Sequence, residues 1–191
     1  MKKIGLTGGI GSGKSTIARI LLAMGYPVYF SDERSKFLTD NHPIIREELM
    51  RLVGKEIYVN EQLDRKALAS AIFNDETLRR KVNEIIHPIV RVDFEEWSAL
   101  QSKALVFNEA AILFETGAAD RYDAMVLVTA PEELRVKRVM QRDKCTHEEV
   151  LRRMQSQWSD ERKKQFADVV IINDDALPLI VQVEKMLTLL N

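Results

Sequence analysis

Near its start the chain reads Gly8-Gly9-Ile10-Gly11-Ser12-Gly13-Lys14-Ser15, and this stretch decides the fold. It matches the phosphate-binding pattern G-x-x-x-x-G-K-[ST] in full. Glycines let the backbone curl so that successive N–H groups point at phosphate oxygens. Lys14 supplies a charge for the β- and γ-phosphates, and the Ser15 hydroxyl is suited to holding Mg²⁺. The stretch therefore predicts that the chain binds a nucleoside triphosphate.

The residues on either side of this loop are typical of a strand and a helix. Lys3-Ile4-Gly5-Leu6-Thr7 is a short apolar run that predicts a buried strand. Apolar residues then recur at helical spacing from Ile17 to Met24, and Gly25 stands where a helix C-terminal glycine belongs. The loop is thus expected at a helix N-terminus, whose dipole and unused N–H groups favour an anion.

Further strands and helices follow along the chain. Apolar runs predict four more strands, at 27–30, 104–107, 124–128 and 169–172. The segment from Ser31 to about Ser102 is largely helical in pattern, and His87-Pro88 should kink or break its last helix. Helices are also predicted at 132–142, at 148–158 and from about Pro178 onward.

Short apolar strands that alternate with helices indicate an α/β fold. We expect a doubly wound parallel sheet of about five strands, of the P-loop NTPase type. The whole chain, 1–191, is expected to be a single kinase domain. An inserted helical lobe at 33–102 has the size to bind an acceptor, and the basic segment 134–164 is expected to form a helical lid.

Composition narrows the classes of protein to consider. The net charge is −1 over 191 residues, which argues against a general nucleic-acid binder. Cys145 is the only cysteine, so no internal disulfide can form and a reducing compartment is expected. No stretch has transmembrane length, and a secretory signal is not apparent. We therefore expect a cytoplasmic protein with small-molecule partners, and no membrane or nucleic acid among them.

Polar residues follow several predicted strands, where parallel sheets bind ligands. Asp32 comes two residues after a strand and is a candidate to accept a proton in phosphoryl transfer; the alternative is a helix cap. Glu109 follows another strand and could hold Mg²⁺, or it could cap the next segment. Asn173 follows the last strand. Arg138 and Arg142 lie on one helical face and could reach the phosphates, although exposed arginines are usually only solvated.

Taken together, these residues resemble dephospho-coenzyme A kinases, which catalyse the last step of coenzyme A synthesis. The similarity runs from Leu6 to about Asp174. The matching segments are 6–16, the strand that ends in Asp32, 63–68 (Leu-Asp-Arg-Lys-Ala-Leu), 86–88 (Ile-His-Pro), 112–115 (Ile-Leu-Phe-Glu), 137–143 (Lys-Arg-Val-Met-Gln-Arg-Asp) and 167–173 (Ala-Asp-Val-Val-Ile-Ile-Asn). Three positions depart from the family pattern: Phe30, Ala111 and Asp175.

The resemblance implies that the chain phosphorylates the ribose 3′-hydroxyl of dephospho-coenzyme A with ATP and Mg²⁺. It implies catalytic roles for Asp32 as general base, for Lys14 and for the lid residue Arg142. ATP would be bound by Gly8 to Thr16, Arg138, Arg142 and Asn173, the last of these near adenine. Arg65 and His87 match positions associated with the acceptor, although His87 before Pro88 is equally compatible with a packing role. The implied metal residues are Ser15 and Glu109.

Two other functions compete with this one. Another small-molecule or nucleotide kinase of the same fold would keep Lys14, Ser15 and the lid but bind a different acceptor. A regulatory GTPase is the alternative from a different class. It is disfavoured because the sequence has no N-K-x-D guanine-reading motif and no D-x-x-G switch after a strand.

Overall fold

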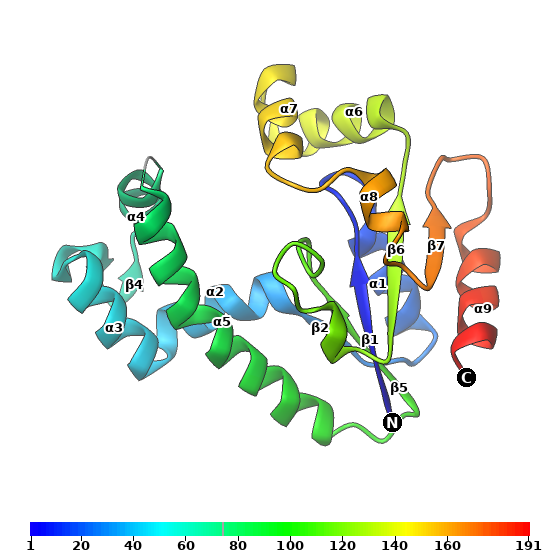
Figure 1. Ribbon diagram of the computed structural model, residues 1–191, viewed down its shortest axis with the longest axis horizontal. Coiled ribbons are helices and arrows are strands. Elements are labelled where there is room, and N and C mark those ends of the chain that lie inside the picture. The colour runs from blue at the N-terminus through cyan, green and yellow to red at the C-terminus, as the bar shows by residue number, and fades with distance from the viewer. Residues whose placement is uncertain (74) are drawn as a thin grey trace. The chain divides into compact units, whose positions relative to one another are not determined.

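The computed structural model describes residues 1–73 and 75–191. The chain forms two compact units, the first made of 1–30 with 101–191 and the second of 31–100. The first unit is an α/β sandwich around a parallel sheet, and the second is mainly helical (Figure 1). The sheet of the first unit was predicted from sequence, and its parallel α/β architecture is confirmed.

The sheet has five strands in the order β2-β5-β1-β6-β7, and every pairing is parallel. All five match the predicted apolar runs to within about two residues at each end. The central strand β1 is flanked by β5 and β6, so the loop that follows it opens at the middle of the sheet's carboxyl edge. The strands are β1 (Lys2–Thr7), β2 (Val28–Phe30), β5 (Leu105–Glu109), β6 (Ala124–Thr129) and β7 (Val169–Ile172).

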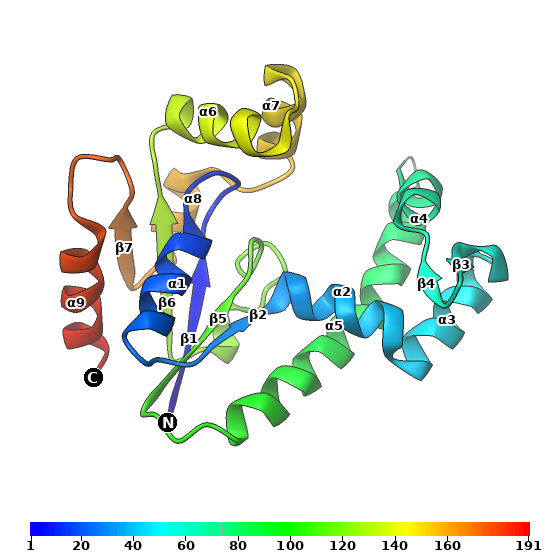
Figure 2. The same cartoon turned by 180° about the vertical axis from the view of Figure 1, so that it is seen from behind.

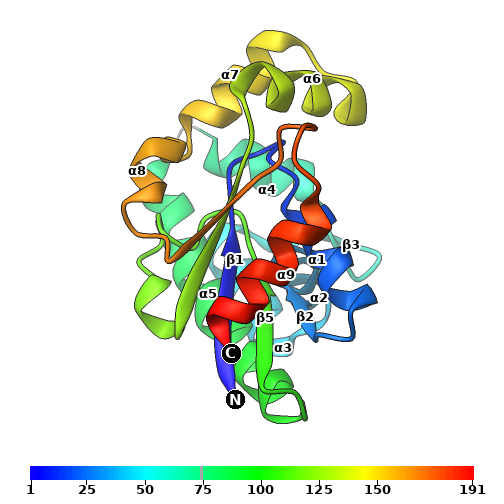
Figure 3. The same ribbon diagram turned by 90° about the vertical axis from the view of Figure 1, so that its right-hand side faces the viewer.

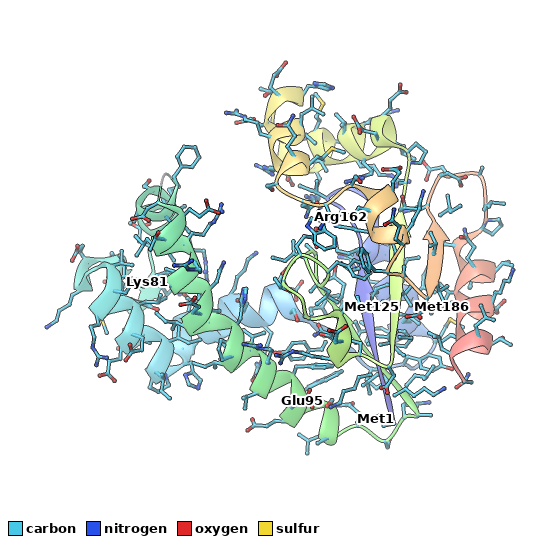
Figure 4. All side chains as sticks on the ribbon, in the orientation of Figure 1. Met1, Lys81, Glu95, Met125, Arg162 and Met186 are labelled. Atoms are coloured by element: carbon cyan, nitrogen blue, oxygen red, sulfur yellow. The ribbon has the colours of Figure 1, made fainter. Side chains whose placement is uncertain are left out.

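Side chains alternate along the strands and build a separate apolar layer on each face of the sheet. On one face pack α1 (Lys14–Ala23) and α9 (Leu179–Leu190), which lie on the same side in Figure 3. The other face is covered by the loop after β5 and by the segment around Trp158. Met186 belongs to the first layer and Met125 to the second; both are labelled in Figure 4.

Three helices connect β6 to β7 in the first unit: α6 (Glu132–Asp143), α7 (His147–Gln155) and α8 (Asp160–Lys164). A capping box starts α7, in which Thr146 and Glu149 each accept a hydrogen bond from the other's backbone N–H. The short helix α8 lies in a segment for which the sequence predicted no helix. Arg162 of α8 stacks over the ring of Trp158 at 3.4 Å from its centroid.

The second unit has its own apolar core, to which each of its helices contributes buried residues. Figure 2 shows the ribbon of these helices. An ion pair joins α2 to α5, where the guanidinium of Arg34 donates to both carboxylate oxygens of Asp93 at 2.7 and 2.8 Å. The elements are α2 (Ser31–Asn41), α3 (Pro43–Val53), the 3₁₀ turn η1 (Lys55–Ile57), β3 (Tyr58–Val59), β4 (Gln62–Leu63), α4 (Arg65–Ile72) and α5 (Glu76–Ala99).

Two details of this unit differ from the sequence prediction. The pair β3–β4 is a small antiparallel hairpin inside a segment expected to be largely helical. The expected break at His87-Pro88 is wrong, because α5 continues through Pro88. A proline inside a helix removes one N–H donor, but apolar residues on both sides of Pro88, such as Ile86 and Ile89, pack against the unit's core. α5 thus remains one helix across Pro88.

Both chain ends lie at the edge of the sheet opposite to the loop after β1 (Figure 1). There the Lys2 ammonium donates to the carbonyl of Leu190 at 2.7 Å and ties the first strand to the last helix. Among the described residues, no helix combines the length and the apolar character that a bilayer crossing requires.

Two neighbouring isoleucines on α3 differ in burial, and substituting each of them tests the core of the second unit. Ile45 is fully buried, whereas Ile44 is 58% exposed. Ile45→Ala should lower the free energy of unfolding by about 2–5 kcal/mol, because it leaves a cavity as well as losing apolar contact. Ile44→Ala removes the same atoms from the surface and should cost less than about 1 kcal/mol. Urea denaturation of both variants checks the difference, and equal losses would contradict this assignment of the core.

Candidate active site

The phosphate-binding stretch forms the turn between β1 and α1. The helix begins at Lys14, and its N-cap residue Gly13 has a φ of 97°. Gly13 makes no side-chain capping bond to this helix start, and a helix N-terminus without such a cap is suited to an anion. The turn is closed by a bond from the Ser12 N–H to the Gly9 carbonyl at 3.1 Å. Ser15 and Thr16 lie exposed in the first helical turn.

The side chain of Asn173 is hydrogen-bonded to the backbone of the loop. Its side-chain amide donates to the Ser12 carbonyl at 2.9 Å, and its own backbone N–H donates to Thr129 at 2.8 Å. A Cβ on Gly13 would lie 2.0 Å from Nδ2 of Asn173, which explains why this position requires glycine. The residue following β7 therefore contacts the loop itself. Its expected proximity to adenine stays a prediction.

Arg138 of α6 reaches the same place. Its guanidinium donates to the carbonyl of Asn173 at 3.1 Å, to Oδ1 of Asn173 at 3.2 Å and to Asp175 at 2.6 Å. The arginine is thus joined to the loop through Asn173, and Asp175, one of the departures from the family pattern, is its ion-pair partner. To contact a phosphate, Arg138 would have to exchange these acceptors.

Arg142 is not brought to the loop. It lies near the end of α6 with 63% of its side chain exposed, and its guanidinium donates to both carboxylate oxygens of Asp143. Arg153 of α7 donates to the same carboxylate at 2.9 Å. The hydrogen bond from Arg142 is the main cause that lowers the pKa of Asp143, and the same bond raises the pKa of Arg142. Arg142 and Arg153 thus share one carboxylate.

The proposed metal residues belong to the same unit as the loop. Glu109 ends β5 and is 6% exposed, and it stands opposite Leu6 in the register of β1 with β5. A buried carboxylate near the start of the loop and an exposed Ser15 hydroxyl fit the oxygen ligands that Mg²⁺ prefers. Among the described residues, no group of three His, Cys, Asp or Glu side chains is placed to hold a metal. A site at Ser15 and Glu109 would therefore depend on nucleotide phosphates for its remaining ligands.

Asp32 lies in the first turn of α2, in the second unit. Its side chain is exposed, and among the described residues it makes no hydrogen bond or ion pair. The capping alternative therefore has no hydrogen bond to support it. Phe30 pairs with Glu109 at the carboxyl end of β5, so the chain leaves the sheet two residues before Asp32.

The two residues expected to meet the acceptor lie on separate helices of the second unit. Arg65, at the start of α4, donates to Asp40 at 2.6 Å and to the Lys36 carbonyl at 3.2 Å. His87 is half-buried on α5. Burial is the larger cause, and the charge of Arg91 the smaller, that lowers the pKa of His87 below 6.5. A neutral imidazole at pH 7 can hydrogen-bond to a ligand but contributes no positive charge.

Three polar residues that touch the loop or support it were not singled out from sequence. Arg135 of α6 and Gln157, between α7 and α8, both bond to the backbone of Ile10, and Asp160 pairs with Arg135. Arg135 belongs to the basic stretch 134–164, but its pattern resembles that of its solvated neighbours. Only the fold shows that it is buried.

The contact at Gly13 generates a matched pair of variants. Gly13→Ala would need a left-handed conformation and would push its Cβ into Asn173. We expect nucleotide affinity to fall about tenfold or more, the size of an effect of 1–3 kcal/mol. Gly117 also has a positive φ, but nothing lies within 4 Å of its Cβ position.

Gly117→Ala is therefore the control. It should cost roughly 1 kcal/mol of stability from the same strain and leave nucleotide affinity unchanged. Calorimetric titration with a nonhydrolysable ATP analogue measures both affinities. Unchanged binding by Gly13→Ala would show that the loop is not the nucleotide site.

The lowered pKa of His87 predicts a pH effect on stability. Folding disfavours the charged imidazole, so below about pH 6.5 the unfolded chain takes up a proton that the folded chain resists. This contribution to stability is complete above pH 6.5 and is lost as the pH falls through that value. His87→Gln should therefore lose less stability than the wild type between pH 8 and pH 5.5 in urea denaturation. His147→Gln, on the exposed face of α7, should keep the full loss.

Known proteins resemble this chain along most of its length. Residues 2–178 match the model of the dephospho-CoA kinase family. The chain is 46% identical over 189 residues to a dephospho-CoA kinase of Bacteroides fragilis, covering 98% of this chain and 92% of that one. The identity to a dephospho-CoA kinase of Porphyromonas gingivalis is 43% over 188 residues, covering 98% and 93%.

Solved structures agree on the fold. A dephospho-CoA kinase from Campylobacter jejuni aligns with a TM-score of 0.72 and 26% identity, covering 98% of this chain and 96% of that one. A shikimate kinase from Acinetobacter baumannii aligns with a TM-score of 0.53 at 20% identity, covering 100% and 93%, which shows a shared fold alone. The family match spans most of the chain and includes the phosphate loop, the buried carboxylate at the end of β5 and the polar residue after β7. The chain belongs to the dephospho-CoA kinase family.

Proposed function

We propose that this protein transfers the γ-phosphate of ATP to the ribose 3′-hydroxyl of dephospho-coenzyme A, giving coenzyme A and ADP. The observation that carries the proposal is the start of α1 directly after a glycine turn held by Asn173. Such a helix start presents N–H groups and a positive dipole end to an anion. The relatives named dephospho-CoA kinase supply the identity of the acceptor.

In the proposed reaction the nucleotide phosphates lie over the loop, with Lys14 against the β- and γ-phosphates. The acceptor oxygen forms a bond to the γ-phosphorus while the bond from that phosphorus to the bridging oxygen of ADP breaks. The hydroxyl proton passes to the carboxylate of Asp32, which lies exposed in the first turn of α2. Arg65 and His87 are proposed to contact the acceptor.

Ser15 and Glu109 would hold Mg²⁺, which supplies neutralisation of charge on the β- and γ-phosphate oxygens when it is bound. Arg142 and Arg138 are proposed to face the phosphates when the segment 134–164 closes as a lid. For Arg142 this means a change of partner, because its guanidinium now lies on Asp143. A phosphate carries more negative charge than a carboxylate, so the exchange is favourable in charge.

The proposed partners are the two small-molecule substrates. The net charge of −1 gives no general attraction to nucleic acid or to anionic membranes. The single cysteine, Cys145, is a free thiol, which suits the reducing cytoplasm in which we propose that the protein works.

The direct test is to incubate the purified protein with Mg·ATP and dephospho-coenzyme A and to follow coenzyme A by mass. The expected product is heavier than the acceptor by one phosphate at the 3′ position. Product from a different phosphate acceptor, with none from dephospho-coenzyme A, would replace the proposal by the other small-molecule kinase that the loop also allows.

Asp32→Asn tests the proton acceptor. The amide keeps the size of the side chain but cannot take the proton, so turnover should fall by about a hundredfold or more, while ATP affinity stays nearly unchanged. Glu33→Gln is the matched control, because Glu33 is the next residue of α2, is also exposed and loses the same charge. Turnover by Asp32→Asn within a fewfold of the control would remove Asp32 from the mechanism.

A further inference from the structure

A buried arginine of α6 lies against the phosphate loop. The side chain of Arg135 is only 9% exposed, and its Nε donates to the carbonyl of Ile10 at 3.0 Å. A Cβ on Gly9 would lie 2.1 Å from Nη2 of Arg135, so the guanidinium is packed directly on the loop backbone. A charge buried this deeply is costly unless it is paired. The buried guanidinium beside the loop therefore needs a partner of opposite charge, and its place there needs a functional explanation.

The partner of Arg135 is Asp160, the first residue of α8. Its carboxylate lies 3.2 Å from Nη1, is itself 8% exposed, and accepts a hydrogen bond from the Thr129 hydroxyl at the end of β6. The pair is thus held from three elements: α6, α8 and β6. Because both charges are buried, the guanidinium is fixed in one position and cannot swing into solvent.

Ile10 is also held from its other side. Its N–H donates to Oε1 of Gln157 at 2.9 Å, and its carbonyl accepts from Arg135. Both main-chain polar groups of one loop residue are therefore bonded to side chains that lie about 125 to 147 positions further along the chain. Both side chains come from the segment 134–164. Neither bond contributes to a helix or a strand, so local secondary structure does not account for them.

We propose that Arg135 and Gln157 are positioning residues for the nucleotide. They hold the peptide groups of Ile10, and with them the shape of the loop that we propose to bind the phosphates, and they join the loop to the segment proposed as a lid. Asp160 acts through Arg135 by fixing its guanidinium. The inference rests on the proposed function of the loop as the ATP site, and it assigns the nucleotide, rather than the acceptor, as the ligand that these residues serve.

The first test removes the bond at the Ile10 N–H. Gln157→Met keeps the length of the side chain but has no oxygen to accept, and Gln155→Met makes the same change at an exposed position of α7. We expect the Kd for a nonhydrolysable ATP analogue and the KM for ATP to rise about tenfold in Gln157→Met, as for one lost hydrogen bond. The KM for dephospho-coenzyme A and the melting temperature without ligand should stay close to those of the control.

The second test concerns the buried pair. Arg135→Gln alone would strand the charge of Asp160, so it is combined with Asp160→Asn, which leaves a neutral pair. Lys137→Gln is the control for removing a positive charge from α6, because Lys137 is exposed on the same helix. We again expect weaker nucleotide binding with an unchanged KM for the acceptor. If this double variant does not fold, Gln157→Met decides the question.

A merely structural role predicts a different result. The melting temperature would then fall, while the folded protein would keep its nucleotide affinity. Nucleotide Kd values within twofold of the wild type, or equal losses for both substrates or in the control variants, would overturn the inference. Nucleotide binding is measured without the acceptor, so the two proposals can fail separately. A wild type that binds the analogue but makes no coenzyme A would refute the proposed function and leave this inference standing.

Discussion

A glycine-rich loop that must offer its N–H groups to a ligand cannot use those groups to hold its own shape. In this protein one bond within the loop joins the Ser12 N–H to the Gly9 carbonyl, and side chains outside the loop supply further bonds that hold its shape. Asn173 donates to the Ser12 carbonyl, Arg135 donates to the Ile10 carbonyl, and Gln157 accepts from the Ile10 N–H. Each of these bonds uses a group of the loop other than those that we propose for phosphate. The fold of the first unit places these three side chains beside the same loop.

This arrangement explains why the second half of the chain carries buried charge. The pair of Arg135 with Asp160 and the pair of Lys163 with Glu115 both involve α8, and Lys163 is fully buried with its ammonium 2.8 Å from Glu115. Apolar residues of similar volume would often be as stable or more so. Buried charged pairs instead favour one position of a helix, and here that helix supports the arginine on the loop. The cost in stability is thus linked to geometry at the site.

The sequence predicted the elements whose signals are local. The loop and all five strands were found because a phosphate-binding motif and short apolar runs need no knowledge of the rest of the chain. Arg135 and Lys163 could not be identified as buried, because long cationic side chains in a basic helical stretch are usually solvated. Pro88 led to a wrong prediction for the opposite reason. Its local cost to the helix is real, but the helix continues, with Ile86 and Ile89 packed on the core at either side of it. The hairpin β3–β4 has only two residues in each strand, too few for a period of two to be recognised.

The features of the candidate site also fall into those that a local sequence signal predicts and those that only the fold determines. Asn173 was predicted from its place after a strand, yet its contact with Ser12 depends on the order of strands in the sheet, which no local pattern contains. For Asp32 both the local sequence signal and the fold matter. It follows a predicted strand, and it lies at the start of the second unit, which has a core of its own. With separate cores, the part of the chain around Asp32 can be adapted to an acceptor without disturbing the packing beneath the phosphate loop. The proposed nucleotide site is therefore constrained by buried charge in the first unit, while the second unit, which we propose to bind the acceptor, is held mainly by apolar packing.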